Sequence, residues 1–220
     1  MNRRLGTRER ATRRPVIVLA GESSGDRKVM RTFIEALCGS AQGRIVEIND
    51  IVRLCKADER SLRQRAIKLA GSARARGARE EASVQCVFIH EDFDETDSEH
   101  RAKVRRRVQE ALDREMARAF YVLAAWEVEA WLLMFPDAIS DFATSWKVPA
   151  RYVGVDTGLI ADPKRVMKKE VARSSPEYRE SDAPAIAEKI TALGLHRSPA
   201  GRNSSYDEFK ASVSDCCGSM

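Results

Sequence analysis

Four short apolar segments alternate with helical patterns along the first 135 residues. Continuous runs of β-branched and other apolar residues, bounded by turns, are typical of strands that are buried on both faces of a parallel sheet. Such runs predict strands at 15–20, 84–90 and 120–125, and the segment 44–51, in which apolar and polar residues are mixed, is interpreted as a further strand. Between them, apolar residues recur at the spacing of one helical face, which predicts helices at 27–37, 61–76 and 98–117, the last capped by Ser98.

This alternation predicts an α/β fold with a mostly parallel sheet of about four strands and helices on both faces. An apolar helix at 127–135 ends at Pro136, and weaker helical patterns follow at 163–172, 184–193 and 205–213. We therefore expect three parts, namely a basic flexible arm (1–14), an α/β domain (15–135) and a mainly helical extension (136–220).

Positive charge is clustered rather than spread. The chain has 38 lysine and arginine residues against 33 acidic ones, a net charge of +5. Clusters of this kind attract polyanions, and nucleic acid, DNA or RNA, is the partner we expect; a simply solvated surface is the alternative. One cluster is in the N-terminal arm, and the other, predicted to bind nucleic acid, consists of Arg101, Lys103, Arg105, Arg106 and Arg107.

Cysteine usage and hydropathy bear on location. The five cysteines form no CxxC pair and no zinc-like cluster, so we expect reduced thiols and neither a zinc site nor a disulfide scaffold. No apolar run approaches the ~20 residues that span a bilayer, and no apolar segment of a secretory signal follows the N-terminal arginines. The prediction is a cytoplasmic protein without a membrane partner.

Acidic residues follow two of the predicted strands. Glu22 comes just after the first strand, and Asp92 and Asp94 come just after the third. Ligands of parallel sheets bind beyond the carboxyl ends of the strands, and side-chain alternation would point Asp92 and Asp94 the same way. Carboxylate oxygens without histidine or thiolate favour Mg²⁺ or Mn²⁺, so we predict that these three residues bind a catalytic metal ion. Solvated turn residues are the alternative.

Several neighbours are assigned supporting roles. Asp26 is interpreted as a helix cap, with a place in the metal site as the alternative. His90 ends the third strand, and we interpret it as bonded to the backbone, with proton transfer as the alternative. Glu129 lies in an apolar stretch, where burial without a partner is costly, so it is predicted to be a fourth metal ligand or an ion-pair partner of Lys164.

The tryptophans beside this glutamate have two interpretations. Trp126 and Trp131 are five residues apart, and we expect core and rim packing rather than stacking on nucleic-acid bases. For the two glutamates at the start of this helix, Glu127 and Glu129, the alternative is that they complement the helix dipole without a catalytic role.

Three motifs together resemble a known family. The chain contains GESSGD before a helix, then VFIHEDFD, then WEVEAWLLMF, with a later DPK at Asp162–Lys164, Tyr178 and a Tyr-x-x-Phe at Tyr206 and Phe209. These features resemble the small Toprim-like proteins of the DUF4276 family. The resemblance implies a Toprim-like fold in which Glu22, Asp92, Asp94 and Glu129 correspond to metal-binding positions. In one departure, Gly21 precedes Glu22, whereas the common Toprim order is glutamate and then glycine.

The function that the resemblance implies is a Mg²⁺-dependent nuclease, acting with an ATPase encoded nearby in defence against phage. The alternative is a non-catalytic binding or toxin-type subunit, whose acidic turn docks a partner while its basic arm binds nucleic acid. The sequence leaves a homo-oligomer open.

Overall fold

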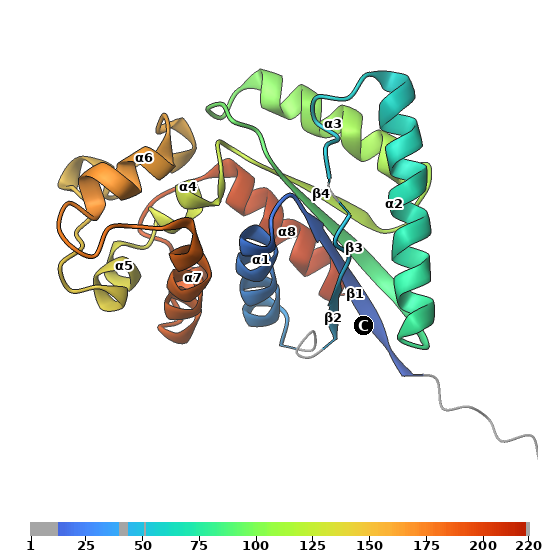
Figure 1. Ribbon diagram of the computed structural model, residues 1–220, viewed down its shortest axis with the longest axis horizontal. Coiled ribbons are helices and arrows are strands. Elements are labelled where there is room, and N and C mark those ends of the chain that lie inside the picture. The colour runs from blue at the N-terminus through green and yellow to red at the C-terminus, as the bar shows by residue number, and fades with distance from the viewer. Residues whose placement is uncertain (1–12, 40–43, 51, 219–220) are drawn as a thin grey trace, which may run out of the picture.

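The protein has the predicted α/β fold, described here in a computed structural model for residues 13–39, 44–50 and 52–218. Four parallel strands form one sheet in the order β2-β1-β3-β4 (Figure 1). The strands are β1 (Arg13–Gly21), β2 (Ile45–Glu47), β3 (Ala82–Asp92) and β4 (Ala119–Ala124).

Helices follow each strand and continue to the end of the described chain. Ser98 caps the helix after β3 as predicted, since its hydroxyl accepts a hydrogen bond from the backbone N–H of Arg101 at 3.2 Å. The helices are α1 (Ser24–Leu37), α2 (Glu59–Arg79), α3 (Glu99–Asp113), α4 (Val128–Leu132), α5 (Pro136–Phe142), α6 (Pro163–Val166), α7 (Ala183–Ala192) and α8 (Ser204–Cys217). A π-helical turn (Met167–Val171) and short 3-10 turns (Ala150–Tyr152, Thr157–Leu159, Glu180–Asp182, Leu195–Arg197) complete them.

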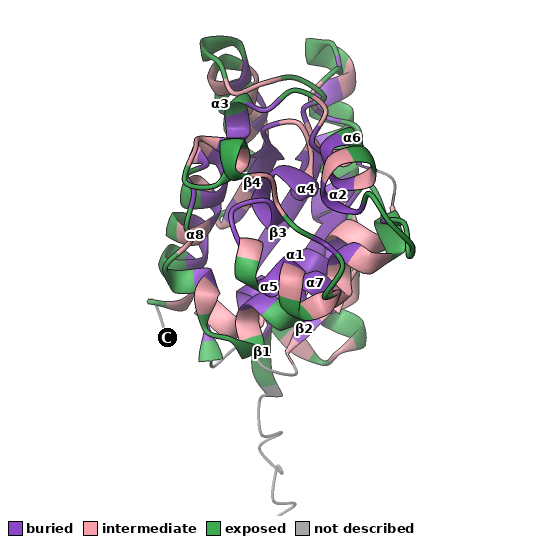
Figure 2. Ribbon diagram, turned by 90° about the vertical axis from the view of Figure 1, so that its left-hand side faces the viewer, coloured by how far each residue is buried: buried purple, intermediate pink, exposed green. Residues whose placement is uncertain are grey.

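Each face of the sheet packs against its own set of helices, because successive strand residues point to opposite sides. Ile17, Leu19 and Phe88 belong to a core shared with α1, α4, α5, α7 and α8, whereas Val18 and Ile89 belong to a second core beneath α2 and α3. The strands are buried in the middle of the molecule (Figure 2). The helices after residue 136 therefore complete the core on one face of the sheet.

The boundaries differ from the predictions in several places; the predicted helices 98–117 and 127–135, for example, end at Asp113 and Leu132. The second strand is only three residues long, shorter than the predicted 44–51, and residue 51 lies outside the described part. The predicted arm lies outside the described residues except for Arg13 and Arg14, which are not part of an arm because β1 begins at Arg13. Within the described residues, no helix has the length and apolar character needed to cross a membrane.

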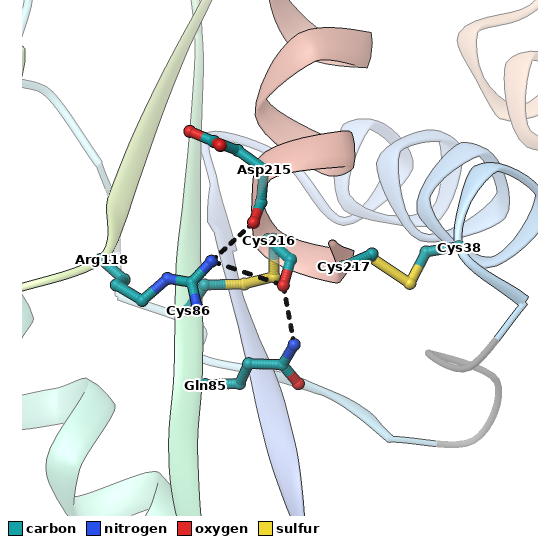
Figure 3. The surroundings of a disulfide bond; sticks show 7 residues. All are labelled: Cys38, Gln85, Cys86, Arg118, Asp215, Cys216 and Cys217. Atoms are coloured by element: carbon teal, nitrogen blue, oxygen red, sulfur yellow. Dashed lines mark hydrogen bonds between the residues drawn. A yellow bond between two sulfur atoms is a disulfide. The ribbon is translucent and has the colours of Figure 1, made fainter. Parts of the chain in front are cut away.

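The prediction of reduced cysteines without disulfides is wrong. Cys38, at the end of α1, is bonded to Cys217, and Cys86, on β3, is bonded to Cys216 (Figure 3). The partners are 179 and 130 residues apart, so no local spacing could reveal them. Reduced thiols therefore no longer support a cytoplasmic location, which stays a prediction.

Candidate functional site

The register of the sheet brings the predicted acidic residues to one edge. β1 and β3 are hydrogen-bonded neighbours, with Gly21 opposite His90 at their carboxyl ends. Glu22 therefore leaves β1 beside the point where Asp92 ends β3. On the other side of β3, Asp92 is opposite Ala124, the last residue of β4, so the start of α4 reaches the same edge.

Asp92 is the central carboxylate of this edge. Its side chain is 17% exposed, and its Oδ1 atom is inaccessible to solvent without a hydrogen-bond donor in the described residues. Burial, followed by the negative charges of Asp26, Glu129, Glu127 and Glu22, raises the pKa of Asp92 well above its ordinary range. An ionised Asp92 therefore lacks neutralisation by the protein itself.

Asp94 does not point with Asp92, so the predicted alternation is wrong at this position. β3 ends at Asp92, and the backbone N–H groups of Phe93 and Asp94 both donate to the carbonyl of Trp126. These bonds hold Asp94 in the left-handed region at a φ of 60°, where extended alternation no longer applies. Its exposed carboxylate pairs instead with Lys56 Nζ at 2.9 Å.

Glu22 and Asp26 flank Asp92 from the β1–α1 turn. Loss of hydration, and next the charge of Glu91, raises the pKa of Glu22, which is exposed. The interpretation of Asp26 as the helix cap is wrong, because Ser23 caps α1 and its Oγ accepts from the Asp26 backbone N–H at 3.1 Å. The Asp26 carboxylate is not used as a cap and lines the pocket in front of Asp92.

Gly21 permits a close packing contact within the same turn. A Cβ atom at this position would lie 3.1 Å from Cγ of Arg27, whose side chain crosses the turn and donates to the Gly21 carbonyl at 3.0 Å. Arg27 also donates to Glu47 and Asn49, which ties α1 to β2 and the loop after it.

His90 is not bonded to the backbone as interpreted from the sequence. It is fully buried, and neither ring nitrogen has a hydrogen-bond partner in the described part of the chain. Its Nε2 atom lies 3.7 Å from Asp92 Oδ1. Burial lowers the pKa of His90, which favours the neutral imidazole.

Glu129 is buried in α4 and interacts with a residue far along the chain. Only 3% of it is exposed, and Oε1 accepts a hydrogen bond from the Tyr178 hydroxyl at 2.8 Å. Burial and the nearby Glu127 raise its pKa to about 7, although Lys164 and Tyr178 act in the opposite direction. A carboxyl group with this pKa can hold or release a proton near neutral pH.

Lys164 pairs with Glu127. The ion pair with Glu129 that the sequence had suggested is not formed. The Nζ atom of Lys164 lies 2.8 Å from Glu127 Oε2, and its backbone N–H donates to Oε1 of the same residue at 2.8 Å. Although burial acts to lower the pKa of Lys164, the bond to Glu127 and the charge of Glu129 raise it. Lys164 therefore stays cationic at the rim of the site.

Glu91 is a further buried carboxylate, which the sequence did not predict. It accepts hydrogen bonds from the Tyr121 hydroxyl at 2.8 Å and from the backbone N–H groups of Leu54 and Cys55 at 2.7 and 3.3 Å. Burial raises its pKa although these bonds lower it. Because Glu91 alternates with Asp92, it faces the opposite side of β3 and holds the β2–α2 loop in place.

A pocket of about 300 Å³ opens in front of these residues. It is lined by the start of α1, including Ser24 and Asp26, by Asp92 at the end of β3 and by Glu129 on α4, with Lys28 and Lys164 at its margin. With Glu180 of the 3-10 turn Glu180–Asp182, acidic and basic side chains from five separate elements therefore face one cavity at the carboxyl edge of the sheet.

The donor set suits a hard divalent cation, although the ligands are not assembled as they stand. The carboxylates supply only oxygen, which Mg²⁺ and Mn²⁺ prefer, and the buried, unpartnered Oδ1 of Asp92 lacks a positive neighbour. However, no three Asp, Glu, His or Cys side chains within the described ranges are close enough together to hold a metal ion. Binding would require rotation of the less buried Glu22 and Asp26.

The arginines of α3 differ among themselves. Arg101 is 2% exposed, and all five of its N–H groups are used, in bonds to Asp97, Ser204, Glu208 and the Leu123 carbonyl. It therefore joins α3 to β4 and α8 and is not available to nucleic acid. The other four members, Lys103, Arg105, Arg106 and Arg107, are exposed or half-buried, and their role in nucleic-acid binding stays a prediction.

The two tryptophans pack as expected. Trp131 is fully buried, stacks on Phe209 and donates from Nε1 to Ser205 Oγ at 2.8 Å. Trp126 is half-buried at the rim, with a φ of 58°.

Comparison with protein-family models, with curated proteins and with solved structures finds no match for this chain. The site is therefore defined by its own geometry, and the Toprim-like resemblance stays a prediction.

Proposed function

We propose that the protein is a Toprim-like nuclease that uses Mg²⁺ or Mn²⁺ at the carboxyl edge of its sheet to hydrolyse phosphodiester bonds. The observation that carries this proposal is the half-buried Asp92 carboxylate, whose inaccessible Oδ1 atom has no partner in the described residues and which lies among other carboxylates. Carboxylates gathered in this way repel one another unless a cation is present. Asp92, Glu22, Asp26 and Glu129 would hold the ion, which when bound would polarise the phosphate and acidify a water molecule.

The residues around this edge have separate tasks in the proposed reaction. Lys164 and Lys28, at the margin of the pocket, attract a phosphate towards the carboxylates. Glu129, with a pKa of about 7, can take up or deliver a proton, and the Tyr178 hydroxyl fixes its Oε1 atom. Asp94 would join the ligands only after releasing Lys56, so it is a weaker candidate than Asp92. The ATPase partner and the role in defence rest on the resemblance alone.

The proposal is tested by incubating the full chain with plasmid DNA and with RNA, with Mg²⁺, with Mn²⁺ and with a chelator. We expect cleavage only with metal, and a loss of about 100-fold or more in Asp92→Asn, the range that removal of a main charge-stabilising group produces. Asp137→Asn, at an exposed position on α5, is the matched control and should retain activity. Cleavage in the chelator, or equal cleavage by Asp92→Asn, would contradict the proposal.

A non-catalytic binding subunit is the second candidate, and one observation favours it. The carboxylates of the described chain are not arranged to hold a metal ion as they stand, and Asp94 is already paired with Lys56. In this case the wild type binds nucleic acid or a protein partner at the same affinity with and without a divalent metal, and it cleaves neither DNA nor RNA.

A further inference from the structure

Positive charge is concentrated on the two helices that cover one face of the sheet. α2 has seven arginine and lysine residues and one glutamate, a net charge of +6. α3 adds a net charge of +2. Because the whole chain has a net charge of only +5, the remainder is negative. A separation of charge on this scale produces a positive field over the α2–α3 side of the molecule.

A groove of about 790 Å³ runs between the two helices and brings their arginines onto one surface. Arg60 and Arg63 line it from α2, and Arg107 and Arg114 line it from α3 and its C-cap. Three glutamates also line the groove, so the attraction comes from the outer surface of both helices rather than from the groove alone. These are Glu59, Glu110 and Glu115.

Three of the arginines that line this groove do not hold the fold together, unlike Arg107, which donates to a backbone carbonyl. Within the described residues, the guanidinium groups of Arg60, Arg63 and Arg114 have no ion-pair or hydrogen-bond partner, in contrast to Arg101 on the same side of the sheet. α2 also uses six arginines and only one lysine. A guanidinium group can bind a phosphate through two parallel hydrogen bonds, which an ammonium group cannot do.

The surface is continuous with the acidic edge through the β2–α2 loop. Arg107, in the groove, donates to the carbonyl of Cys55 at 2.7 Å. The next residue, Lys56, pairs with Asp94, and the N–H of Cys55 itself donates to Glu91. A polyanion lying along α2 and α3 would therefore approach Asp94 and Glu91, which do not line the pocket in front of Asp92.

We propose that the outer surface of α2 and α3 binds the phosphate backbone of nucleic acid, with Arg60, Arg63 and Arg114 as its principal contacts. The fate of the bound strand rests on the proposed function, whereas the binding itself does not. α2 thus adds contacts to those predicted from the sequence for the N-terminal arm and for α3.

The test measures the binding of two fluorescent probes to the full chain, a DNA duplex of about 20 base pairs and a single-stranded RNA of about 20 nucleotides. A chelator is present throughout, so that metal-dependent cleavage is suppressed. The wild type should bind at least one of the two probes. The triple variant Arg60→Gln/Arg63→Gln/Arg114→Gln should bind that probe more weakly than the wild type does. Its slope of log affinity against log salt should be shallower by about 0.9 for each lost contact on duplex DNA, or about 0.7 on a single strand.

A matched triple variant removes the same charge elsewhere. Lys147→Gln/Arg173→Gln/Arg197→Gln changes three exposed residues of the C-terminal helical part and should leave the salt slope unchanged. Equal slopes for the two triple variants would assign binding to net charge and overturn the proposal. Failure of the wild type to bind either probe at low salt would also overturn it.

Two further arms separate this proposal from others. Competition by poly-glutamate that matches the nucleic acid in strength and depends on the same three arginines would assign the surface to an acidic polypeptide and overturn the proposal. Asp92→Asn should bind the probe at least as tightly as the wild type. Arginine-dependent binding without metal-dependent cleavage would contradict the proposed nuclease function and support the α2–α3 binding surface. Metal-dependent cleavage that is insensitive to the three arginines would support the nuclease and contradict the binding surface.

Discussion

Charged residues at the carboxyl edge of the sheet and charged residues on the α2–α3 surface follow opposite rules. At the edge, Asp92, Glu129 and Arg101 are largely withdrawn from water. Glu129 and Arg101 bond to residues far along the chain, whereas one Asp92 oxygen has no partner in the described residues. On the surface, Arg60 and Arg63 face solvent and act together through their number. From this difference we expect each charge at the edge to matter for stability and for the proposed chemistry, and the surface charges to matter mainly for the proposed binding.

The largest loss of stability is expected from Arg101→Ala, in contrast to a second arginine of the same helix. Arg101→Ala removes a buried cation and leaves Asp97 and Glu208 without their main partner, so it should lower the free energy of unfolding by about 3–5 kcal/mol. Arg106→Ala, at an exposed position of α3, should change it by less than about 0.5 kcal/mol. Urea unfolding of both variants measures the difference, and similar losses would remove the distinction between edge and surface.

Next in size is a pH effect of Glu129. Its pKa of about 7 in the folded protein lies above the ordinary 4.5, so the folded state holds the proton more tightly. The contribution of Glu129 to the free energy of unfolding is therefore complete below pH 4.5 and is lost as the pH rises to about 7. At 1.36 kcal/mol per pKa unit, this loss amounts to about 3 kcal/mol.

Glu129→Gln tests this effect, because the amide oxygen still accepts from Tyr178 but cannot ionise. The variant should lack this part of the pH dependence and be more stable than the wild type at pH 8 without metal. Unfolding measured at a series of pH values gives the comparison, and parallel curves for the two proteins would show that Glu129 titrates normally.

A neutral contact at the edge should have an intermediate effect. Ser205 Oγ accepts hydrogen bonds from the Ala125 backbone N–H at 3.1 Å and from Trp131 Nε1 at 2.8 Å. Ser205→Ala leaves both buried donors without a partner and should cost about 2 kcal/mol. The control is Ser214→Ala, at an exposed position of the same helix, which should cost almost nothing. Equal thermal unfolding of the two variants would mean that α8 does not hold α4 in place.

The smallest effect is expected where the edge becomes exposed. The side chains of Lys56 and Asp94 are 75% and 65% exposed, and pairs of this kind contribute between zero and about 1 kcal/mol. Lys56→Gln should therefore lower stability by about 0.5 kcal/mol or less, with no effect in high salt. A large, salt-independent loss would place this pair among the buried charges.

The sequence predicted those features that neighbouring residues determine. Short apolar segments alternating with helical patterns identified the four strands, and Ser98 was recognised as the cap of α3 because a cap and its partner lie in one turn. The parallel order then accounts for Glu22 and Asp92 meeting at one edge.

Features that depend on distant residues were missed. Arg101 is buried because Glu208 lies beside it, and that residue is 107 positions away. Asp94 turns from Asp92 because the Trp126 carbonyl fixes the backbone before it. The disulfide partners are separated by even longer stretches of chain. The cap of α1 was also missed, because only the backbone geometry shows that Ser23 rather than Asp26 accepts the hydrogen bond.

The central claim is that Asp92 is the principal ligand of a divalent metal ion, and calorimetric titration of Mn²⁺ into the full chain tests it most directly. The wild type and the exposed-site control Asp137→Asn should bind Mn²⁺ with the same affinity, because Asp137 lies on α5, outside the acidic edge. Asp92→Asn should bind at least about 10-fold more weakly, since its amide brings no charge to offset the cation. Equal affinity in Asp92→Asn, or no binding by the wild type, would contradict the account.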